Sequence, residues 1–256
     1  MSTSPVRIGS TYVLSVSSVR DLGVHIIDSD VSLRTHVTAT VRSCFAALRQ
    51  IRSARRCLPQ HVLLTLFSVL VVSKVDHCCS VLAGVSSYLQ LQHRLQSILN
   101  AAARLVFSAR RSERIPPLLR DLHWLRVPER IQFRLCVLAF QCLNGSAPPY
   151  LAESVRRTAD VEGRRHLRSS ATMTLVVTSV QRSTLGDRAF PVAASGAWNR
   201  LPFRTISSLT SFRQQLKTQL FRLSLANFHY PPHCYYNSVK FPCIVRVTMS
   251  LKSVHW

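Results

Sequence analysis

The feature that most constrains this chain is an apolar period of about 3.6 residues, which recurs in several separate segments. After Leu33, the positions on one side of a helix are apolar: Val37, Val41, Cys44, Phe45, Leu48 and Ile51. Ser32 can cap this helix, and Pro59 suits the first turn of a second helix that runs to about Leu70. Because such faces must be buried against one another, the pattern predicts a mainly α-helical fold.

Three more helices are expected. Ser87 can cap a third helix, which would complete a bundle. Its apolar face comprises Leu91, Leu95, Ile98, Leu99, Ala102, Leu105 and Val106. Pro116 and Pro117 open a short helix toward Trp124, and Pro128 opens a helix that is apolar nearly all round and ends at Asn144–Gly145. We expect this last helix to be buried.

Small β parts are expected on either side of these helices. Short apolar runs at Val6–Ile8, Tyr12–Val16 and Leu22–Ile27 predict an N-terminal β-ribbon. A smaller C-terminal α/β unit is expected to contain a β-like stretch at Leu175–Val180, a turn at Gly186–Asp187, an apolar segment at Phe190–Trp198 and a final helix. That helix carries Phe212, Leu216, Leu220 and Leu223 on one face.

A polar, arginine-rich stretch without an apolar period separates these two parts and predicts a linker or mobile loop. Its arginines are Arg156, Arg157, Arg164, Arg165 and Arg168. The predicted organisation is a β-ribbon over 1–32, helices over 33–153, a basic linker over 154–172, the small unit over 173–225 and an irregular tail over 226–256.

The charge predicts a polyanionic partner. The chain of 256 residues has 33 Lys and Arg against 11 Asp and Glu, a net charge of +22 that is spread along its whole length. Neutralising phosphates releases condensed counterions, so RNA, DNA or an RNA–DNA hybrid is the expected partner, with an anionic membrane as the competing one. Arginine suits bidentate phosphate contacts, although GC-rich coding DNA would produce the same excess over lysine.

The candidate nucleic-acid-binding residues are Arg42, Arg49, Arg52, Arg56 and Arg104. Arg42, Arg49 and Arg56 recur every seven residues and should form a stripe along one flank of the first helix. The alternative interpretation is an ordinary solvated helix face.

No catalytic or metal-binding residue is predicted. Asp28 and Asp30 resemble a two-carboxylate metal motif, but they stand where a strand gives way to a helix, and aspartate is common there for structural reasons. Histidine and cysteine near the C-terminus match no familiar zinc spacing. These residues are His229, His233, Cys234, Cys243 and His255. The cysteines of His77–Cys78–Cys79 are expected to pack rather than react.

Targeting signals are not evident. The longest apolar stretch, Val62–Val72, is shorter than a membrane-spanning helix and is expected to be a buried core helix. No membrane partner is expected. The N-terminal residues do not resemble a signal peptide, and the eight cysteines lack the dense spacing of a disulfide scaffold. We expect an intracellular protein, nuclear or cytoplasmic.

Several short blocks occur in a fixed order along the chain. They are Val19–Val24 followed by Asp28 and His36, Ser73–Cys78, Asn100–Leu105, Leu122–Leu125 with Val127, Arg130–Ile131 and Phe133, Ala147–Pro148 with Tyr150–Leu151, Leu167–Ser170, Gly186–Phe190, Ala197–Pro202, Ser211–Phe212, Leu216–Thr218 and Leu220–Phe221. The ordered set resembles the C-terminal part of non-LTR (LINE-type, jockey- and CR1-like) retrotransposon reverse transcriptases. His77 and Cys79 stand where that family usually has Tyr and Asn, and Phe228–Trp256 does not resemble it.

The resemblance implies the end of the palm near the primer grip over 1–32, followed by a thumb-like bundle that holds template and product. The family's catalytic aspartates, which bind Mg²⁺, belong to an N-terminal polymerase portion, and no adjacent Asp-Asp pair occurs here. We therefore expect a truncated element or fragment that is inactive alone and needs the missing polymerase portion. The alternatives are an independent basic helical protein that binds RNA, DNA or a partner helix, and a zinc-dependent or other small hydrolase.

Overall fold

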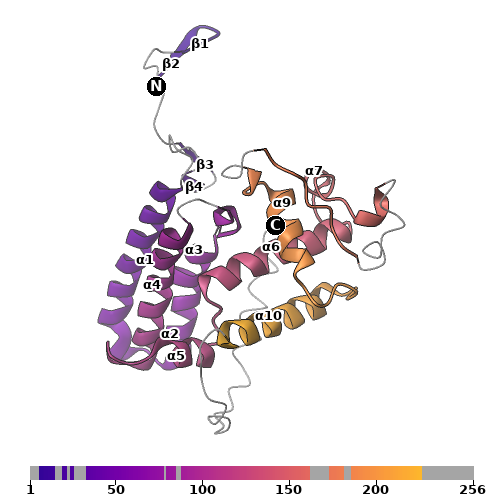
Figure 1. Cartoon of the computed structure of the whole chain (residues 1–256). Helices are drawn as coiled ribbons and strands as arrows, with labels where there is room; N and C mark the ends of the chain where they lie inside the picture. Colours follow the sequence, from indigo (N-terminus) through magenta and orange to yellow (C-terminus); the bar gives the residue numbers. More distant parts are fainter. Residues whose placement is uncertain are drawn as a thin grey trace.

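The computed structural model describes residues 6–14, 19–21, 24–25, 33–77, 79–84, 88–161, 173–181 and 186–226. The described residues are mainly helical, with short antiparallel strands near the N-terminus (Figure 1). The predicted fold class, mainly α with small β parts, is confirmed.

The N-terminal strands form two small antiparallel pairs. Strand β1 (Val6–Ile8) pairs with β2 (Thr11–Val13), and Gly9 in the turn between them has a φ of 61°. Strand β3 (Arg20–Asp21) pairs with β4 (Val24–His25). The predicted strand at 12–16 ends at residue 13. The other predicted strand, at 22–27, is described only at 24–25, where it forms β4.

Helix α1 (Arg34–Ala54) leads the bundle and buries the apolar face that its sequence predicts, including Val37, Cys44 and Leu48. Ser32, the predicted cap, lies outside the described residues. The helix begins at Arg34, so Leu33 occupies the cap position, with a φ of 58° and no side-chain hydrogen bond to the helix end. Leu33 itself is buried in the core.

The second helix is longer than predicted. Helix α2 (Gln60–Phe67) continues through a π-helical turn (Ser68–Val72) into α3 (Ser73–Asp76). No proline or glycine interrupts 60–76, and the Ser68 and Ser73 hydroxyls donate hydrogen bonds to carbonyls one turn earlier. The helix therefore does not stop near residue 70.

Helix α4 (Tyr88–Phe107) packs along α1, and two proline-initiated helices follow: α5 (Ile115–Asp121) and α6 (Val127–Leu143). The predicted end of α6 is confirmed. Gly145 has a φ of 68°, and the Ser146 N–H donates to the carbonyl of Gln141, as in a Schellman motif. Most of the apolar side chains of α6 are buried, because other helices surround it.

The beginning of the predicted linker is packed rather than loose. After the short helix α7 (Pro149–Ala152), Val155 packs against the core, Thr158 is buried, and the Arg157 guanidinium donates to the carbonyl of Leu143 at 2.9 Å. Val155 and Thr158 thus pack against the rest of the protein, although this stretch has no apolar period from which their packing could be predicted. Arg164, Arg165 and Arg168 lie outside the described residues.

The β-like stretch predicted at 175–180 does not form a strand. Only Leu175 of the predicted strand at 175–180 forms a bridge, to Arg157, while 190–199 forms helix α9 (Phe190–Asn199). The Asn199 side chain bonds both the N–H and the carbonyl of Leu175, so it satisfies the groups that a neighbouring strand would pair. Helix α10 (Leu209–Ala226) confirms the last predicted helix.

One buried cluster runs through all these helices. Both α9 and α10 pack on α6, and Trp198 and Phe212 lie in the same core as the residues of α1 and α4. Stacking of Phe140 on Phe212, with ring centroids 4.6 Å apart, joins the two regions directly. The core is thus continuous across the predicted linker, while the proposed domain ranges stay a prediction. The tail over 227–256 lies outside the described residues.

Candidate nucleic-acid interface

The first part of the bundle is almost free of negative charge. Residues 33–112 contain eleven Lys and Arg but one acidic residue, Asp76. The carboxylate of Asp76 faces Arg130 at 2.7 Å, and the two side chains are only 13% and 11% exposed. The one acidic group of this stretch is therefore neutralised inside the protein and does not offset the arginines on its surface.

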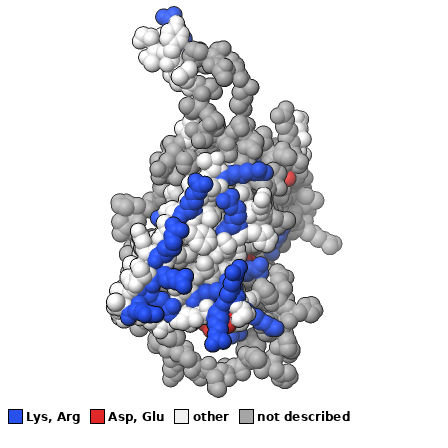
Figure 2. Space-filling view, turned by 90° about the vertical axis from the view of Figure 1, so that its left-hand side faces the viewer, with Lys and Arg blue, Asp and Glu red and all other residues white. Residues whose placement is uncertain are grey.

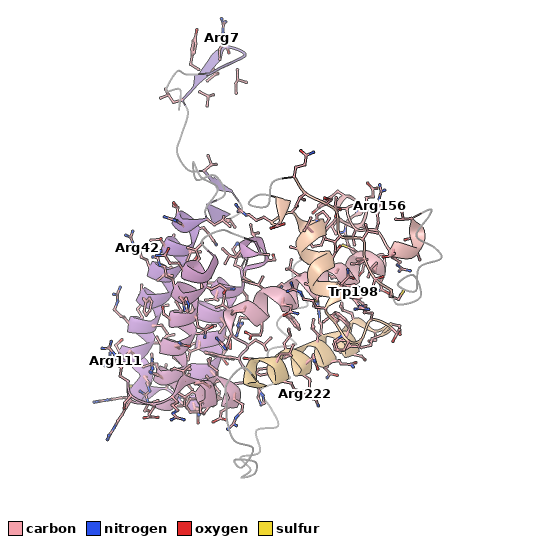
Figure 3. The ribbon with its side chains drawn as sticks, viewed as in Figure 1. Arg7, Arg42, Arg111, Arg156, Trp198 and Arg222 are labelled. Atoms are coloured by element: carbon pink, nitrogen blue, oxygen red, sulfur yellow. The ribbon has the colours of Figure 1, made fainter. Side chains whose placement is uncertain are left out.

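The outer face of α1 presents two of the predicted residues to solvent. Arg42 and Arg49 are exposed and lie on the side of the helix opposite to the buried Cys44, Leu48 and Ile51. Figure 2 shows Lys and Arg gathered on this side of the molecule, and Figure 3 shows Arg42 pointing outward from it. Neither α1 nor the adjacent α4 contains an acidic residue.

The end of α1 concentrates the charge further. Four arginines and Ser53 line an open depression on the surface; the arginines are Arg49, Arg52, Arg55 and Arg56. The helix ends at Ala54, so Arg56 lies on the following 3₁₀ turn (Arg55–Cys57) rather than on the helix. Of the three arginines expected to form a stripe along the helix, only Arg42 and Arg49 lie on α1. The turn places the third, Arg56, at the depression.

Two neighbouring helices add basic side chains that sequence reasoning missed. Arg94 of α4 donates a hydrogen bond to the Thr38 hydroxyl on α1 at 3.0 Å, one turn before Arg42. Lys74 of α3 donates to the Ser43 hydroxyl on α1 at 2.8 Å. Both contacts join residues more than 30 positions apart in the chain, so no local pattern could have predicted that Arg94 and Lys74 lie beside α1.

Arg104 is held differently from the other four candidates. It is only partly exposed, its terminal guanidinium nitrogen donates to the carbonyl of Arg111 at 3.3 Å, and its Nε is enclosed without a hydrogen-bond partner. It therefore fixes the loop between α4 and α5, and that loop carries the exposed Arg110, Arg111 and Arg114. Figure 3 shows Arg111 on the same side of the molecule as Arg42.

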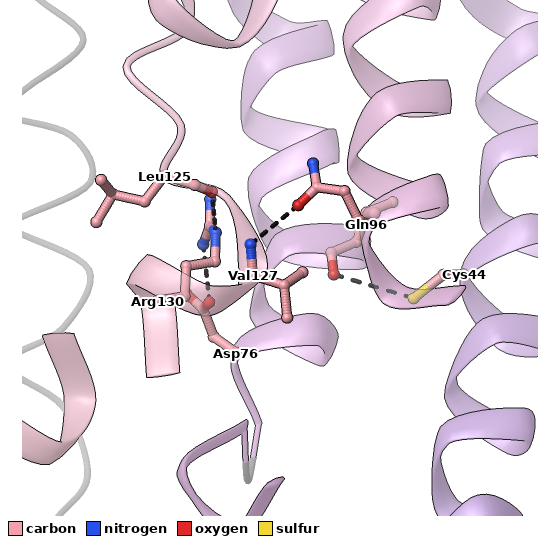
Figure 4. Close-up of polar contacts among 7 residues, drawn as sticks. Cys44, Asp76, Gln96, Leu125, Val127 and Arg130 are labelled. Carbon is pink, nitrogen blue, oxygen red and sulfur yellow. Dashed lines mark hydrogen bonds and ion pairs between the residues drawn. The ribbon is translucent and has the colours of Figure 1, made fainter. Parts of the chain in front are cut away.

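Interior polar contacts hold these helices in place (Figure 4). Arg130 donates to both Asp76 and the carbonyl of Leu125, and so connects α3 with the start of α6. The Gln96 side-chain oxygen accepts from the N–H of Val127 at 2.9 Å, which satisfies one of the free N–H groups at the start of α6. The basic surface thus lies on helices whose relative positions are fixed by buried contacts.

Of the residues that the sequence raised as possible catalytic, reactive or metal-binding groups, the structure describes only some. Cys79 is buried, as expected, whereas His77 is exposed. The expected packing of Cys78 falls outside the described residues, as do Asp28, Asp30 and the whole C-terminal group of His229, His233, Cys234, Cys243 and His255.

Within the described part of the chain, no group of three or more His, Cys, Asp or Glu side chains could hold a metal ion. Of the helices described, none is long and apolar enough to cross a membrane.

Comparison with protein-family models, with curated proteins and with solved structures found no match to this chain.

Proposed function

We propose that this chain binds the sugar-phosphate backbone of duplex or hybrid nucleic acid, as the thumb-like C-terminal part of a non-LTR retrotransposon reverse transcriptase. The observation that carries the proposal is the surface formed by α1, the turn after it and α4. It presents Arg42, Arg49, Arg52, Arg55 and Arg56 without a neighbouring carboxylate on either helix. This group of five is called the α1 surface below.

The dimensions of the α1 surface suit a polyanionic strand. From position 42 to position 54 the helix rises about 18 Å, at roughly 1.5 Å per residue. Phosphates along one strand of B-DNA are spaced about 3.4 Å apart along the helix axis, so this length spans about five of them. A row of exposed guanidinium groups over that distance can contact successive phosphates, or phosphates on both sides of a groove.

The chemistry of the surface favours backbone contacts over base recognition. Arginine binds phosphate oxygens bidentately and remains protonated at any physiological pH. Phosphate contacts fix the position of a duplex but do not read its sequence. We therefore expect weak sequence selectivity and a strong dependence on salt.

The family part of the proposal is supported by where the resembling blocks lie in the fold. Asp76 of the Ser73–Cys78 block pairs with Arg130 of a later block. Trp198 and Asn199 of the Ala197–Pro202 block hold residues 173–175 through hydrogen bonds to Met173 and Leu175. These blocks thus supply the contacts that keep the helices together. If the family proposal holds, polymerisation would need the N-terminal polymerase portion.

The test is the salt dependence of binding to a fluorescent DNA duplex and to an RNA–DNA hybrid. A plot of log K against log salt has a negative slope. Replacing Arg42, Arg49 and Arg56 by Gln should make that slope shallower by about 2.7, at roughly 0.9 per lost phosphate contact. Between 50 and 200 mM salt, that difference makes the affinity of the native protein fall about 40-fold more than that of the variant.

The matched control replaces three exposed arginines elsewhere, Arg156, Arg200 and Arg222, by Gln. It removes the same charge, and Figure 3 shows Arg156 and Arg222 away from Arg42. We expect the control to change the slope by less than one unit. Equal slopes for the two triple variants would show that net charge alone causes binding, and would reject the α1 surface as the site.

A further inference from the structure

The depression at the end of α1 holds more positive charge than a single backbone phosphate can neutralise. It is lined by Arg49, Arg52, Ser53, Arg55 and Arg56 and has a volume of about 770 Å³. A phosphodiester carries one negative charge and offers two unbridged oxygens, which one guanidinium can bind bidentately. Four arginines around one depression therefore favour a ligand with several charges close together. This site is called the arginine depression below.

The backbone that carries these arginines is fixed by the core. Arg49 precedes Arg52 by three positions and Arg56 follows it by four, a spacing that places side chains on one side of a helix. Between them Ile51 is buried, and Leu58, just after the turn, packs against the core. The N–H of Leu58 also donates to a carbonyl of the turn at 3.3 Å. The arginines therefore project from a backbone that is anchored on both sides of the depression.

Carboxylates do not offset the charge of the arginine depression. Among the described residues, its lining contains no acidic side chain, and none of its guanidinium groups forms an ion pair or a hydrogen bond with a carboxylate. The Ser53 hydroxyl donates to the carbonyl of Gln50 at 2.8 Å and brings no charge. The end of α1 contributes a partial negative charge of about half a unit, which is small against four guanidinium groups. An anion among the arginines would reduce their mutual repulsion.

We propose that the arginine depression binds a group of two or more linked phosphates. Linked phosphates carry several negative charges side by side, so different guanidinium groups can each bind one of them. The volume lies within the range of roughly 300–1,000 Å³ that is usual for small-ligand sites. The group belongs either to free pyrophosphate or a nucleotide, or to the 5′ end of an RNA strand. The inference rests on the proposed function, because it names what one part of the α1 surface recognises.

The first experiment measures binding of inorganic pyrophosphate and of inorganic phosphate to the full chain by titration calorimetry, at equal ionic strength and without nucleic acid. The native protein should bind pyrophosphate at least about tenfold more tightly than phosphate, because the second phosphate adds charge-assisted hydrogen bonds. The double variant Arg52→Gln, Arg56→Gln should bind pyrophosphate at least about tenfold more weakly than the native protein. Both arginines are exposed, so the fold should be retained, which circular dichroism checks.

The matched control replaces Arg156 and Arg222 by Gln, which are exposed and which Figure 3 shows away from Arg42. It removes the same charge and should change the affinity for pyrophosphate by less than about twofold, because distant surface charges are screened. Equal losses in the two double variants would overturn the proposal, since net charge alone would then explain binding. Equal affinity of the native protein for phosphate and pyrophosphate would overturn it as well, in favour of a site for one phosphate.

The second experiment separates the two sources of linked phosphates, with RNA of one sequence that ends in a 5′-triphosphate or in a 5′-hydroxyl. Tighter binding of the triphosphate RNA, lost in Arg52→Gln, Arg56→Gln, assigns the site to the end of a strand. Equal binding of the two RNAs, with pyrophosphate binding intact, assigns it to free pyrophosphate or a nucleotide. An unchanged duplex salt slope in the α1 variants would reject the proposed function but leave the pyrophosphate result standing.

Discussion

Breaking the Asp76–Arg130 pair should destabilise the protein far more than breaking an ion pair on its surface. The two groups are 2.7 Å apart, and their side chains are 13% and 11% exposed. Asp76→Asn keeps the shape of the side chain but leaves the Arg130 guanidinium without its counter-charge in a nearly dry site. Arg130→Met removes the positive charge that faces the carboxylate and also removes the donor to the Leu125 carbonyl.

Removing one partner of a buried pair costs about 3–5 kcal/mol, since the remaining charge stays buried without compensation. We expect at least 3 kcal/mol for each single variant, which corresponds to a fall in Tm of about 6–12 °C in a protein of this size. The double variant Asp76→Asn, Arg130→Met leaves no isolated charge. It should therefore be destabilised by less than the sum of the two singles, by roughly 2 kcal/mol or more.

The assay is urea unfolding followed by circular dichroism at 25 °C, with the slope compared between variants to check that they unfold alike. The exposed pair Arg120–Asp121, at 3.5 Å and with 52% and 53% exposure, supplies the control. Asp121→Asn should cost less than about 1 kcal/mol. If Asp76→Asn costs no more than Asp121→Asn, or if the two single effects simply add, then the pair does not connect α3 to α6 and the reasoning fails.

Two further outcomes follow from burial and backbone geometry. Gly84 and Gly145 have nearly equal φ values of 70° and 68°, but a Cβ on Gly84 would lie 2.8 Å from the carbonyl oxygen of Asp187, whereas one on Gly145 meets nothing. Gly145→Ala should cost about 1–2 kcal/mol from backbone strain, and Gly84→Ala about 1–3 kcal/mol more, measured by urea unfolding; equal costs would mean that residue 84 does not approach residue 187. Burial raises the pKa of the Cys136 thiol to about 12, so Cys136 stays protonated at pH 8 and should react with a disulfide reagent only after unfolding. The exposed Cys57 should react in the folded protein, and peptide mapping that finds both labelled at the same rate would contradict the buried position of Cys136.

Local signals in the sequence predicted the helices well because those signals act over a few residues. The apolar period after Leu33 predicted the buried face of α1, Pro128 marked the start of α6, and Gly145 marked its end. The same reasoning was wrong where a distant residue replaces a local partner. The stretch 175–180 has β-like composition, but the Asn199 side chain satisfies the backbone of Leu175, and no strand continues beyond it.

Some residues of the candidate site could likewise be predicted from the sequence, and others could not. Arg42 and Arg49 could be placed on an exposed face from spacing alone, since both lie opposite to the apolar positions of one helix. Arg55 was missed, because only the turn after Ala54 brings it beside Arg49 and Arg56. Arg94 was missed as well, because only the packing of α4 on α1 places it near Arg42.

By itself, the sequence determined that this chain is basic, mainly helical and almost without acidic residues between positions 33 and 112, because composition and a 3.6-residue period are local properties. Only the tertiary structure decided which charges stay on the surface and which are cancelled inside. Asp76 meets Arg130 through helices that are distant in the chain. Pairing between distant helices depends on how all their apolar faces are buried together, and no short segment contains that information.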